Sequence, residues 1–483
     1  MRTTNFLILI MIMFFSISCE DILEQEPKSA ITKVNFWQTP RDAEAGLLAV
    51  YNLYMNTVYR QMELGDFRSD NIEIPPKWGF EMVNPGTLDF NANNISPSDG
   101  MSNWNMFFNV IARANEVYYF TGLIEFIDAA DKNRILGEAL FLRANMYFIL
   151  VKNWGAVPLI TEPFLSQGED MYMERTPVNE VYAQIIEDLN QAEQLLPANR
   201  TDLRIRASKA AAQAQLVDVL LTRGYTSFAE STDFATAVTK ADAVIANPNY
   251  SLESGANFAN IFRNDGNRET ILEIEFNYIN NATHEFSNAF LPRAYQKFRP
   301  FGGQTHALPS HSLVESFDSL DLRLETTFKF LGPPEAQYFD DHLVGMPYVN
   351  KYLGTITEMG VQRYGDDNII LYRLADVLLM KAEALVRTND ISGAMLLVNQ
   401  VRTRAGLVDV SASTAGEAID LILAERKKEL AFEGKRWYDL IRNDRVSEFR
   451  TEPEFLQGRI LLAVPQPEID RNPKLLPQNP TYN

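Results

Sequence analysis

Apolar residues recur at helical spacing along most of the chain. Thr39-Pro40 supplies an N-cap and a first-turn proline, and an apolar stripe follows at Ala43, Leu47, Val50, Tyr51 and Tyr54. The same periodicity returns over residues 104–123, 134–151, 181–197, 207–227 and 235–246. This pattern predicts a mainly α-helical fold, with a helical N-terminal part over residues 39–256.

Two helix junctions have matching sequences. Residues 232–237 and 389–394 both place a polar residue, Asp and an apolar residue first, then two further residues and Ala. Each junction follows a helix rich in Ala and Leu. A small Ala at such a junction lets two helices approach closely, as in tetratricopeptide hairpins. The repeated pattern therefore predicts a tetratricopeptide-like scaffold of helical hairpins.

Between residues 257 and 366 the helical pattern gives way to a segment rich in proline, glycine and aromatic residues. Residues 270–278 alternate between apolar and polar positions and predict a half-exposed strand. Because this composition does not suit a regular helix, we predict an irregular, loop-rich excursion here. Loops of this kind often carry binding residues. A C-terminal helical part with an extended tail is expected over residues 367–483.

The stretch AERKKELAFEGKRWYDLIRND, residues 424–444, combines dense charge with regularly spaced apolar residues. The spacing predicts that four apolar residues share one face of a single helix: Leu423, Leu430, Trp437 and Ile441. A solvated surface helix is one interpretation of the charges. Gly434 in the middle and Trp437-Tyr438 near the end favour the other interpretation, a packed helix whose charges are partly paired inside the protein.

Composition narrows the classes of function. The chain has 483 residues, of which 46% are hydrophobic, so it can bury a large core. Its formal net charge is −19, with no basic block. Binding to nucleic acid needs concentrated Lys and Arg, and this balance argues against a nucleic-acid partner.

The single cysteine, Cys19, follows a charged start, an apolar run over residues 6–15 and the small residues Ser16 and Ser18. This order is typical of a secretory signal over residues 1–18. A cysteine directly after such a signal resembles a bacterial lipobox, in which the thiol is acylated. We therefore predict a lipid anchor at Cys19 and a tether over residues 19–38. An ordinary signal peptide with an incidental cysteine is the alternative.

Catalytic and metal-binding patterns are missing from the sequence. His306 and His311 are separated by Pro309, which spoils a same-face helical pair, so no zinc site is expected. The sequence has no nucleophile elbow, phosphate loop or dinucleotide fingerprint, and we expect neither a catalytic residue nor a cofactor. Aromatic residues in loop-like segments could instead stack on sugar rings, line a peptide site or simply belong to the core: Trp78, Phe80, Tyr295, Phe298, Phe301, Tyr338, Tyr348 and Tyr352.

Several long motifs occur in the order found in one known family. They include GDFRSDN (65–71), EALFLRANMYFILVKNWGAVPLI (138–160), ERKKELAFEGKRWYDLIR (425–442) and VPQPEIDRNPKLLPQNPTY (464–482). Over essentially its whole length the chain resembles the SusD/RagB family of outer-membrane nutrient-binding lipoproteins. One departure is Thr481, where the family usually has Gly.

This resemblance implies a SusD-like α/α fold and a non-catalytic lipoprotein at the surface of the outer membrane. It implies a SusC-like TonB-dependent barrel transporter as partner, and an oligosaccharide as ligand, or a peptide in RagB-like members. By position alone, Trp78 is the leading ligand-binding candidate, with Asn71, Tyr295 and Arg299 as further partners. The charges of residues 425–444 are expected to pair within the scaffold, away from the ligand. A lipid-anchored glycoside hydrolase and a tetratricopeptide-type assembly protein are the alternatives from other classes.

Overall fold

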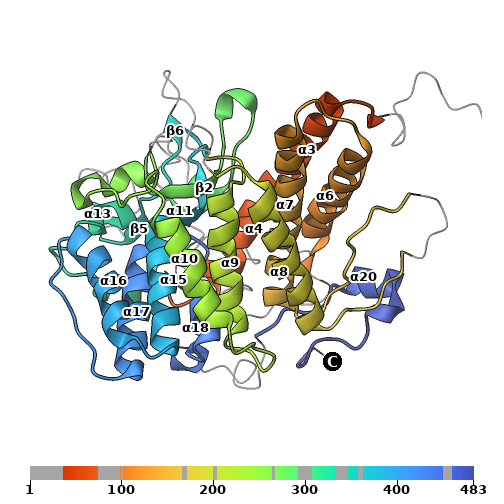
Figure 1. Ribbon diagram of the computed structural model, residues 1–483. Coiled ribbons are helices and arrows are strands. Elements are labelled where there is room, and N and C mark those ends of the chain that lie inside the picture. Colours follow the sequence, from red (N-terminus) through yellow and green to blue (C-terminus); the bar gives the residue numbers. More distant parts are fainter. Residues whose placement is uncertain are drawn as a thin grey trace, which may run out of the picture.

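The computed structural model describes residues 36–73, 98, 102–165, 171–198, 204–263, 267–291, 307–332, 345–356, 363–449 and 460–482. Helices dominate these residues (Figure 1). The longer ones, in chain order, are α3 (Pro40–Met55), α6 (Asn105–Leu123), α7 (Ala129–Trp154), α8 (Val178–Leu195), α9 (Lys209–Arg223), α10 (Asp233–Ile245), α15 (Leu374–Arg387), α16 (Ile391–Arg404) and α17 (Ala415–Glu429). The mainly helical fold predicted from the sequence is confirmed.

Helix α3 begins where the sequence predicts it. The Thr39 side chain accepts a hydrogen bond from the Asp42 amide, and the Asp42 carboxylate accepts one from the Thr39 amide at 2.7 Å. This capping box satisfies two backbone donors that would otherwise lack partners at the helix end. Tyr51 and Tyr54 then differ in burial: Tyr54 is fully buried, whereas Tyr51 is only partly covered.

Neighbouring helices pair as hairpins, as the repeated junctions predict. Helix α9 packs on α10, and α15 packs on α16. The junction residues Ala237 and Ala394 are both fully buried, so a larger side chain at either position would push the two helices apart. In Figure 1 these hairpins lie side by side, with α10 next to α15, and α3, α6, α7 and α8 continue the helical array.

Much of the middle of the chain forms short antiparallel strand pairs. They are β1 (Ile72–Glu73) with β3 (Leu308–Pro309), β2 (Thr270–Ile274) with β8 (Ile369–Arg373), β4 (Phe328–Phe330) with β5 (Pro347–Val349), and β6 (Thr355–Ile356) with β7 (Arg363–Tyr364). Between them lie the short helices α11 (Phe286–Phe290), α12 (His311–Glu315) and α13 (Leu324–Thr327).

The strand predicted at residues 270–278 differs from expectation. It is shorter, and all of β2 is buried, so the half-exposed strand was wrong. One edge of β2 pairs with β8, and on the other the Glu273 amide donates to the Arg204 carbonyl at 3.0 Å. Helix α9 also packs against β2, which leaves no solvated face for the polar positions.

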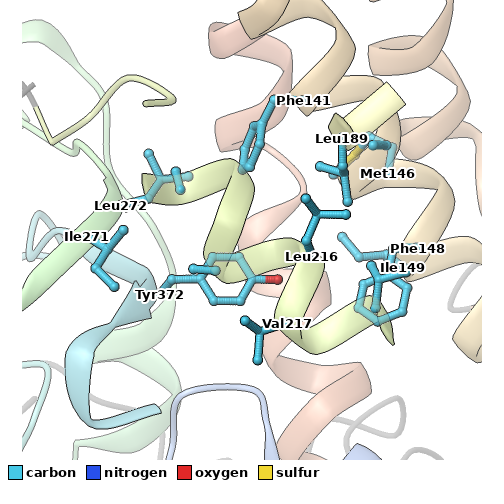
Figure 2. Packing of buried hydrophobic residues seen from close by; sticks show 14 of the residues in the cluster. Phe141, Met146, Phe148, Ile149, Leu189, Leu216, Val217, Ile271, Leu272 and Tyr372 are labelled. Carbon is cyan, nitrogen blue, oxygen red and sulfur yellow. The ribbon is translucent and has the colours of Figure 1, made fainter. Parts of the chain in front are cut away.

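The main core lies where α9 meets the neighbouring helices and the β2–β8 pair. Figure 2 shows Leu216 and Val217 between the helical side and the strand side. Buried side chains from both sides surround them: Phe141, Met146, Phe148, Ile149, Leu189, Ile271, Leu272 and Tyr372. Because one continuous core joins the helices to β2 and β8, this strand pair is held in a fixed position on the scaffold.

The charged stretch at residues 424–444 is not one helix. Helix α17 ends at Glu429, and α18 (Arg436–Arg442) starts again after a turn. The prediction of a single helical face was therefore wrong. Phe432 and Gly434 have φ angles of 64° and 72°, in the left-handed region that an α-helix cannot use. The packed interpretation is confirmed, since Trp437 is fully buried and the charges form internal ion pairs.

Candidate functional site

The motif GDFRSDN forms the start of the predicted ligand-binding segment. After α4 (Val58–Met62), residues Glu63–Phe67 form the single π-helical turn η2, a feature that is common at functional sites. Only glycine fits at position 65, because a Cβ atom there would lie 2.0 Å from the carbonyl oxygen of Gly434. Asp66 Oδ2 also accepts a hydrogen bond from the Gly434 amide at 2.5 Å. The C-terminal motif thus supports the base of this segment.

Two carboxylic acids in this turn are buried. Burial raises the pKa of Glu63 to about 7, although Arg60 lies 3.1 Å away and acts to lower it. Burial likewise raises the pKa of Asp66 to about 7, against the opposing hydrogen bond from Gly434. Both groups therefore titrate near neutral pH rather than near pH 4.

A two-stranded ribbon joins the two predicted loop segments. In the β1–β3 pair, Glu73 lies opposite Leu308, and the Ser310 amide donates to the Asn71 carbonyl at 2.9 Å. Because the strands are antiparallel, the chain leaves β1 after Glu73 at the same end where it enters β3. The Ala307 amide also donates to the Ala289 carbonyl at 3.3 Å. The first of residues 74–97 and the last of residues 292–306 therefore adjoin the same end of the ribbon.

The structure places the predicted site residues as follows. Asn71 is fully buried at the base of the ribbon, and among the described residues its side-chain amide has no hydrogen-bond partner. Trp78, Tyr295, Arg299 and Cys19 lie outside the described residues.

The other aromatic residues predicted to lie in loops are either buried in the core or outside the described residues. Tyr348 and Tyr352 are core residues, and the Tyr352 hydroxyl donates to the Phe432 carbonyl at 2.8 Å. The remaining loop aromatics lie outside the described residues: Phe80, Phe298, Phe301 and Tyr338.

A cleft of about 620 Å³ opens between α3 and the segment that follows β2. Its walls are formed by Leu48, Tyr51, Asn52, Met55, Asn56, Tyr59, Ile205, Arg206, Ile274, Glu275, Phe276, Asn280, Asn281, Ala282, Thr283, His284 and Glu285. This volume lies within the range of small-molecule binding sites in proteins. The combination of tyrosine rings with four asparagines suits a ligand that has both apolar faces and many hydroxyl groups.

One wall of the cleft is a tight turn after β2. The Asn277 amide donates to the Ala282 carbonyl at 2.8 Å, and the Asn277 side chain accepts a bond from the Ile279 amide at 2.9 Å. Asn281 adopts a left-handed conformation with φ 56°, which Asn tolerates better than most residues. The turn thereby holds Asn280 and Asn281, both exposed, at the edge of the cleft.

His284 closes this turn as a neutral residue. Its ring packs edge-on against Phe276 and Phe286, each with 4.7 Å between centroids. Burial lowers the pKa of His284 to about 4, although its Nε2 lies 2.8 Å from the Asp367 carbonyl oxygen. At neutral pH its ring can donate one hydrogen bond and accept one, without adding charge to the cleft.

The opposite wall is fixed by an ion pair beneath Tyr51. The Tyr51 hydroxyl donates to Glu138 at 2.8 Å and accepts a bond from the Ala207 amide at 2.9 Å. Arg206 lies over the Tyr51 ring at 4.9 Å and pairs with Glu138 at 2.5 Å and with Glu44 at 2.9 Å. The two carboxylates compensate the guanidinium charge, so the tyrosine ring is held rigidly.

The cleft and the ribbon belong to one region. Tyr59 contacts the rings of Phe67 in η2 and Phe286 in α11, at centroid distances of 6.5 and 5.5 Å. Helix α11 has five residues and therefore spans about 7.5 Å, from beside Glu285 in the cleft wall to Leu291, where residues 292–306 begin. The cleft lies close to the attachment of both loop segments.

Sequence reasoning missed most of the cleft. Tyr51 belongs to the apolar stripe of α3 and looked like a core residue, and Asn52, Asn56 and Tyr59 were not singled out. One usable signal was the run Asn277–Asn281, in which three of five residues are Asn in a segment with no helical period.

Glutamates of the charged C-terminal motif pair with arginines from other segments of the chain. They form a separate internal group, here termed the buried ion-pair cluster. It consists of Glu269, Arg323, Arg373, Arg404, Glu425, Glu429 and Glu433. Arg373 contacts Glu269 at 2.7 Å and Glu433 at 2.8 Å, and Arg323 contacts Glu429 at 2.7 Å. Although burial opposes ionisation, these arginines hold the pKa of Glu429 well below its usual range. The cluster is structural, as predicted.

Among the described residues, no group of three or more His, Cys, Asp and Glu side chains is arranged to hold a metal ion. His311 is exposed and pairs with Glu315 at 3.0 Å, and His306 lies outside the described residues. The helices of the described part of the chain are all too short or too polar to cross a membrane.

The helical hairpins form a scaffold, and the cleft and the β1–β3 ribbon lie on it. This arrangement defines a scaffold protein of the tetratricopeptide-like helical class. The family described as the SusD family matches residues 340–482. A second SusD-like family, described as starch-binding associating with outer membrane, matches residues 21–221. The chain belongs to the SusD/RagB family.

Individual relatives agree with this assignment. SusD-like protein P38 of Formosa agariphila is 29% identical over 99% of this chain and 98% of its own length. The structure of B. fragilis NanU matches with a TM-score of 0.82 at 24% identity, over 95% of this chain and 100% of that one. A laminarin-binding SusD-like protein matches with a TM-score of 0.77 at 25% identity, over 92% and 100%. The resemblance inferred from the motifs is confirmed.

Proposed function

We propose that the protein is a cell-surface lipoprotein that captures oligosaccharides and delivers them to a SusC-like TonB-dependent transporter in the outer membrane for nutrient uptake. The observation that carries this proposal is the cleft, where two tyrosines and four asparagines lie together near the attachment of both loop segments. The laminarin-binding relative supports a glycan as ligand.

The chemistry of the cleft suits sugars. A pyranose ring presents C–H groups on its faces, which can lie on the rings of Tyr51 and Tyr59. Its hydroxyls are both donors and acceptors, and the side-chain amides of Asn52, Asn56 and Asn280 offer both in return. Trp78, Tyr295 and Arg299 would complete the site from the two loop segments.

Direct binding is the first test. Purified protein lacking the signal segment is titrated in a calorimeter with neutral oligosaccharides such as laminarin fragments, with anionic oligosaccharides and with short peptides. Saturable binding of any oligosaccharide class supports the proposal. Binding of peptides alone would replace it with the RagB-like alternative, a peptide-capturing lipoprotein.

We infer that the protein acts by binding alone. One relative is named a laminarin-binding SusD-like protein, and the carboxylates of the buried ion-pair cluster are paired internally. Prolonged incubation with a bound oligosaccharide should leave its chain length unchanged by mass spectrometry. Shortened products that disappear with one Asp or Glu substitution would indicate a glycoside hydrolase instead.

The anchor and the partner are tested in cells. Cys19→Ala should move the protein from the membrane fraction to the soluble fraction, because the acylated thiol is the proposed anchor. Continued membrane retention would mean a different anchor. Affinity purification from detergent-solubilised membranes should recover a barrel transporter with the tagged protein. Recovery of other proteins alone would favour the assembly-protein alternative.

A further inference from the structure

Asp70 connects the ligand-side segment to the charged C-terminal motif. Arg436 donates to both carboxylate oxygens of Asp70, from Nε at 2.7 Å and from Nη2 at 3.0 Å. Lys427 Nζ lies 2.9 Å from Oδ2 of the same carboxylate. A bidentate arginine and a lysine on one carboxylate fix its position and orientation together.

The backbone of Asp70 holds a third segment. Its carbonyl oxygen accepts hydrogen bonds from Ser310 Oγ at 2.5 Å and from Ser312 Oγ at 3.1 Å. Lys427 Nζ donates to Ser312 Oγ at 3.0 Å, which closes a ring of contacts. Asp70 therefore links residues on both sides of the β1–β3 ribbon to α17 and α18.

The ribbon needs such support because it is very short. Each strand has two residues, and an isolated hairpin of that length is not stable in water. Asp70 lies two residues before β1, and Ser310 directly follows β3. The contacts of Asp70 therefore brace one end of the ribbon, and Glu73 and Leu308 lie at the other end.

The charge of this contact persists over the whole physiological range. Burial works against ionisation of Asp70, but Arg436 and Lys427 outweigh it and set the pKa of Asp70 to about 2. Arg436 is itself anchored, because its Nη1 donates to the Leu423 carbonyl at 2.9 Å.

We propose that Asp70, clamped by Arg436, Lys427, Ser310 and Ser312, is a positioning residue that holds the β1–β3 ribbon in place next to the cleft and so supports ligand binding. This inference rests on the proposed binding function, but the order of the ribbon can be measured without a ligand. Asp70 touches no ligand in this proposal and acts through the ribbon.

The test compares Asp70→Asn with a matched control, Asp188→Asn. Asp188 also accepts a bidentate arginine pair, from Arg143 at 2.7 and 2.6 Å, but between α7 and α8. Lys427→Met, which leaves the Arg436 pair in place, serves if Asp70→Asn fails to fold. Affinity is measured well below every melting transition, and amide hydrogen exchange is followed at Leu308 and Ser310, whose amides face β1.

We expect Asp70→Asn to weaken oligosaccharide affinity by about tenfold or more and to accelerate exchange at both ribbon amides. Asp188→Asn should keep affinity within about twofold and leave ribbon exchange unchanged, even if it lowers the melting temperature as much. Unchanged ribbon exchange in Asp70→Asn and Lys427→Met would overturn the inference, as would equal affinity losses in both Asp variants. If the wild-type protein binds neither oligosaccharide nor peptide, the proposed function fails, and ribbon exchange still decides the role of Asp70.

Discussion

The buried ion-pair cluster and the cleft use polar residues in opposite ways. In the cluster, the charged side chains are at most 5% exposed and each carboxylate meets at least one arginine, as Glu429 meets Arg323 and Arg373. In the cleft, the side chains of Asn52, Asn56, Asn280 and Asn281 face solvent. Dense charge therefore belongs to the folded scaffold in this protein, whereas exposed amides and tyrosine rings line the cleft that we propose as the ligand site.

Disrupting the buried ion-pair cluster should give the largest loss of stability. Glu429→Gln removes a charge shared by Arg323, Arg373 and Arg404, and leaves these buried guanidinium groups undercompensated. We expect a loss of about 3–5 kcal/mol in the free energy of unfolding, measured by urea titration. The exposed pair of Arg445 with Glu448 is the control, and Arg445→Gln should cost less than about 1 kcal/mol. Similar losses in both variants would contradict a structural role for the cluster.

The next effect is a difference in the pH dependence of stability between two buried carboxylic acids, Asp66 at the base of the ligand segment and Asp376 in α15. Asp66 has a pKa of about 7 in the folded protein and near 4 when unfolded, so the folded state binds more protons between these values. Its contribution to stability is therefore present at low pH and lost as pH rises from about 4 to 7, by at most about 1.4 kcal/mol per pH unit. Glu63 acts in the same direction, and His284, with a lowered pKa, acts in the opposite one.

Asp66→Asn removes only the first of these contributions and keeps an oxygen that can accept from Gly434. Relative to wild type, the variant should gain stability as pH rises from 5 to 7, measured as melting temperature against pH. Asp376→Asn is the contrasting variant, because Lys435 and Arg426 overcome burial and set the pKa of Asp376 to about 2. Its deficit relative to wild type should be constant over the same range. Parallel curves for wild type and Asp66→Asn would refute the raised pKa.

On the ligand side, Trp78→Ala tests the leading stacking residue. We expect a loss of about 1–3 kcal/mol in oligosaccharide affinity, if stacking of bases on aromatic rings is a guide to sugars. Trp37→Ala is the control, since Trp37 stacks on Phe120 at 5.3 Å and is not a cleft residue. It should lower the melting temperature and leave the calorimetric affinity unchanged. Wild-type affinity in Trp78→Ala would remove Trp78 from the site.

The smallest change in affinity should come from Asn52→Ala. This variant separates an effect on ligand binding from an effect on stability. Asn52 is exposed in the last turn of α3, where Ala is the better helix former, so stability should stay the same or rise slightly. Loss of the amide should reduce oligosaccharide affinity by about 0.5–1.5 kcal/mol. Gln194→Ala, at an exposed position on α8, should leave affinity unaffected. An equal change in both variants would exclude a direct role for Asn52.

The sequence predicted the scaffold well where local chemistry decides the structure. The Thr39–Asp42 cap starts α3, and the small residues Ala237 and Ala394 identify the hairpins, because both signals depend on neighbouring residues alone. The single helix predicted across residues 424–444 failed, since the turn at Phe432 and Gly434 is set by contact of Gly434 with Gly65, more than 360 positions earlier. Periodicity along one segment carries no information about such a contact.

The site was predicted only in outline. The sequence pointed to Asn71 and the loop segments, and the ribbon shows why both segments attach at one place. The cleft was missed because Tyr51 shares the helical stripe of true core residues such as Val50. Whether a residue on such a stripe is covered depends on what packs above it, here the turn from Asn277 to Ala282, and that is a tertiary fact.

The β1–β3 ribbon also has a consequence for how this protein could be engineered or could diversify. The chain leaves β1 after Glu73 and re-enters the scaffold at Ala307 beside Ala289, so residues 74 and 306 adjoin the same end of a ribbon of four residues. We therefore expect a change in the length of either segment, residues 74–97 or 292–306, to leave the residues of the ion-pair cluster unchanged.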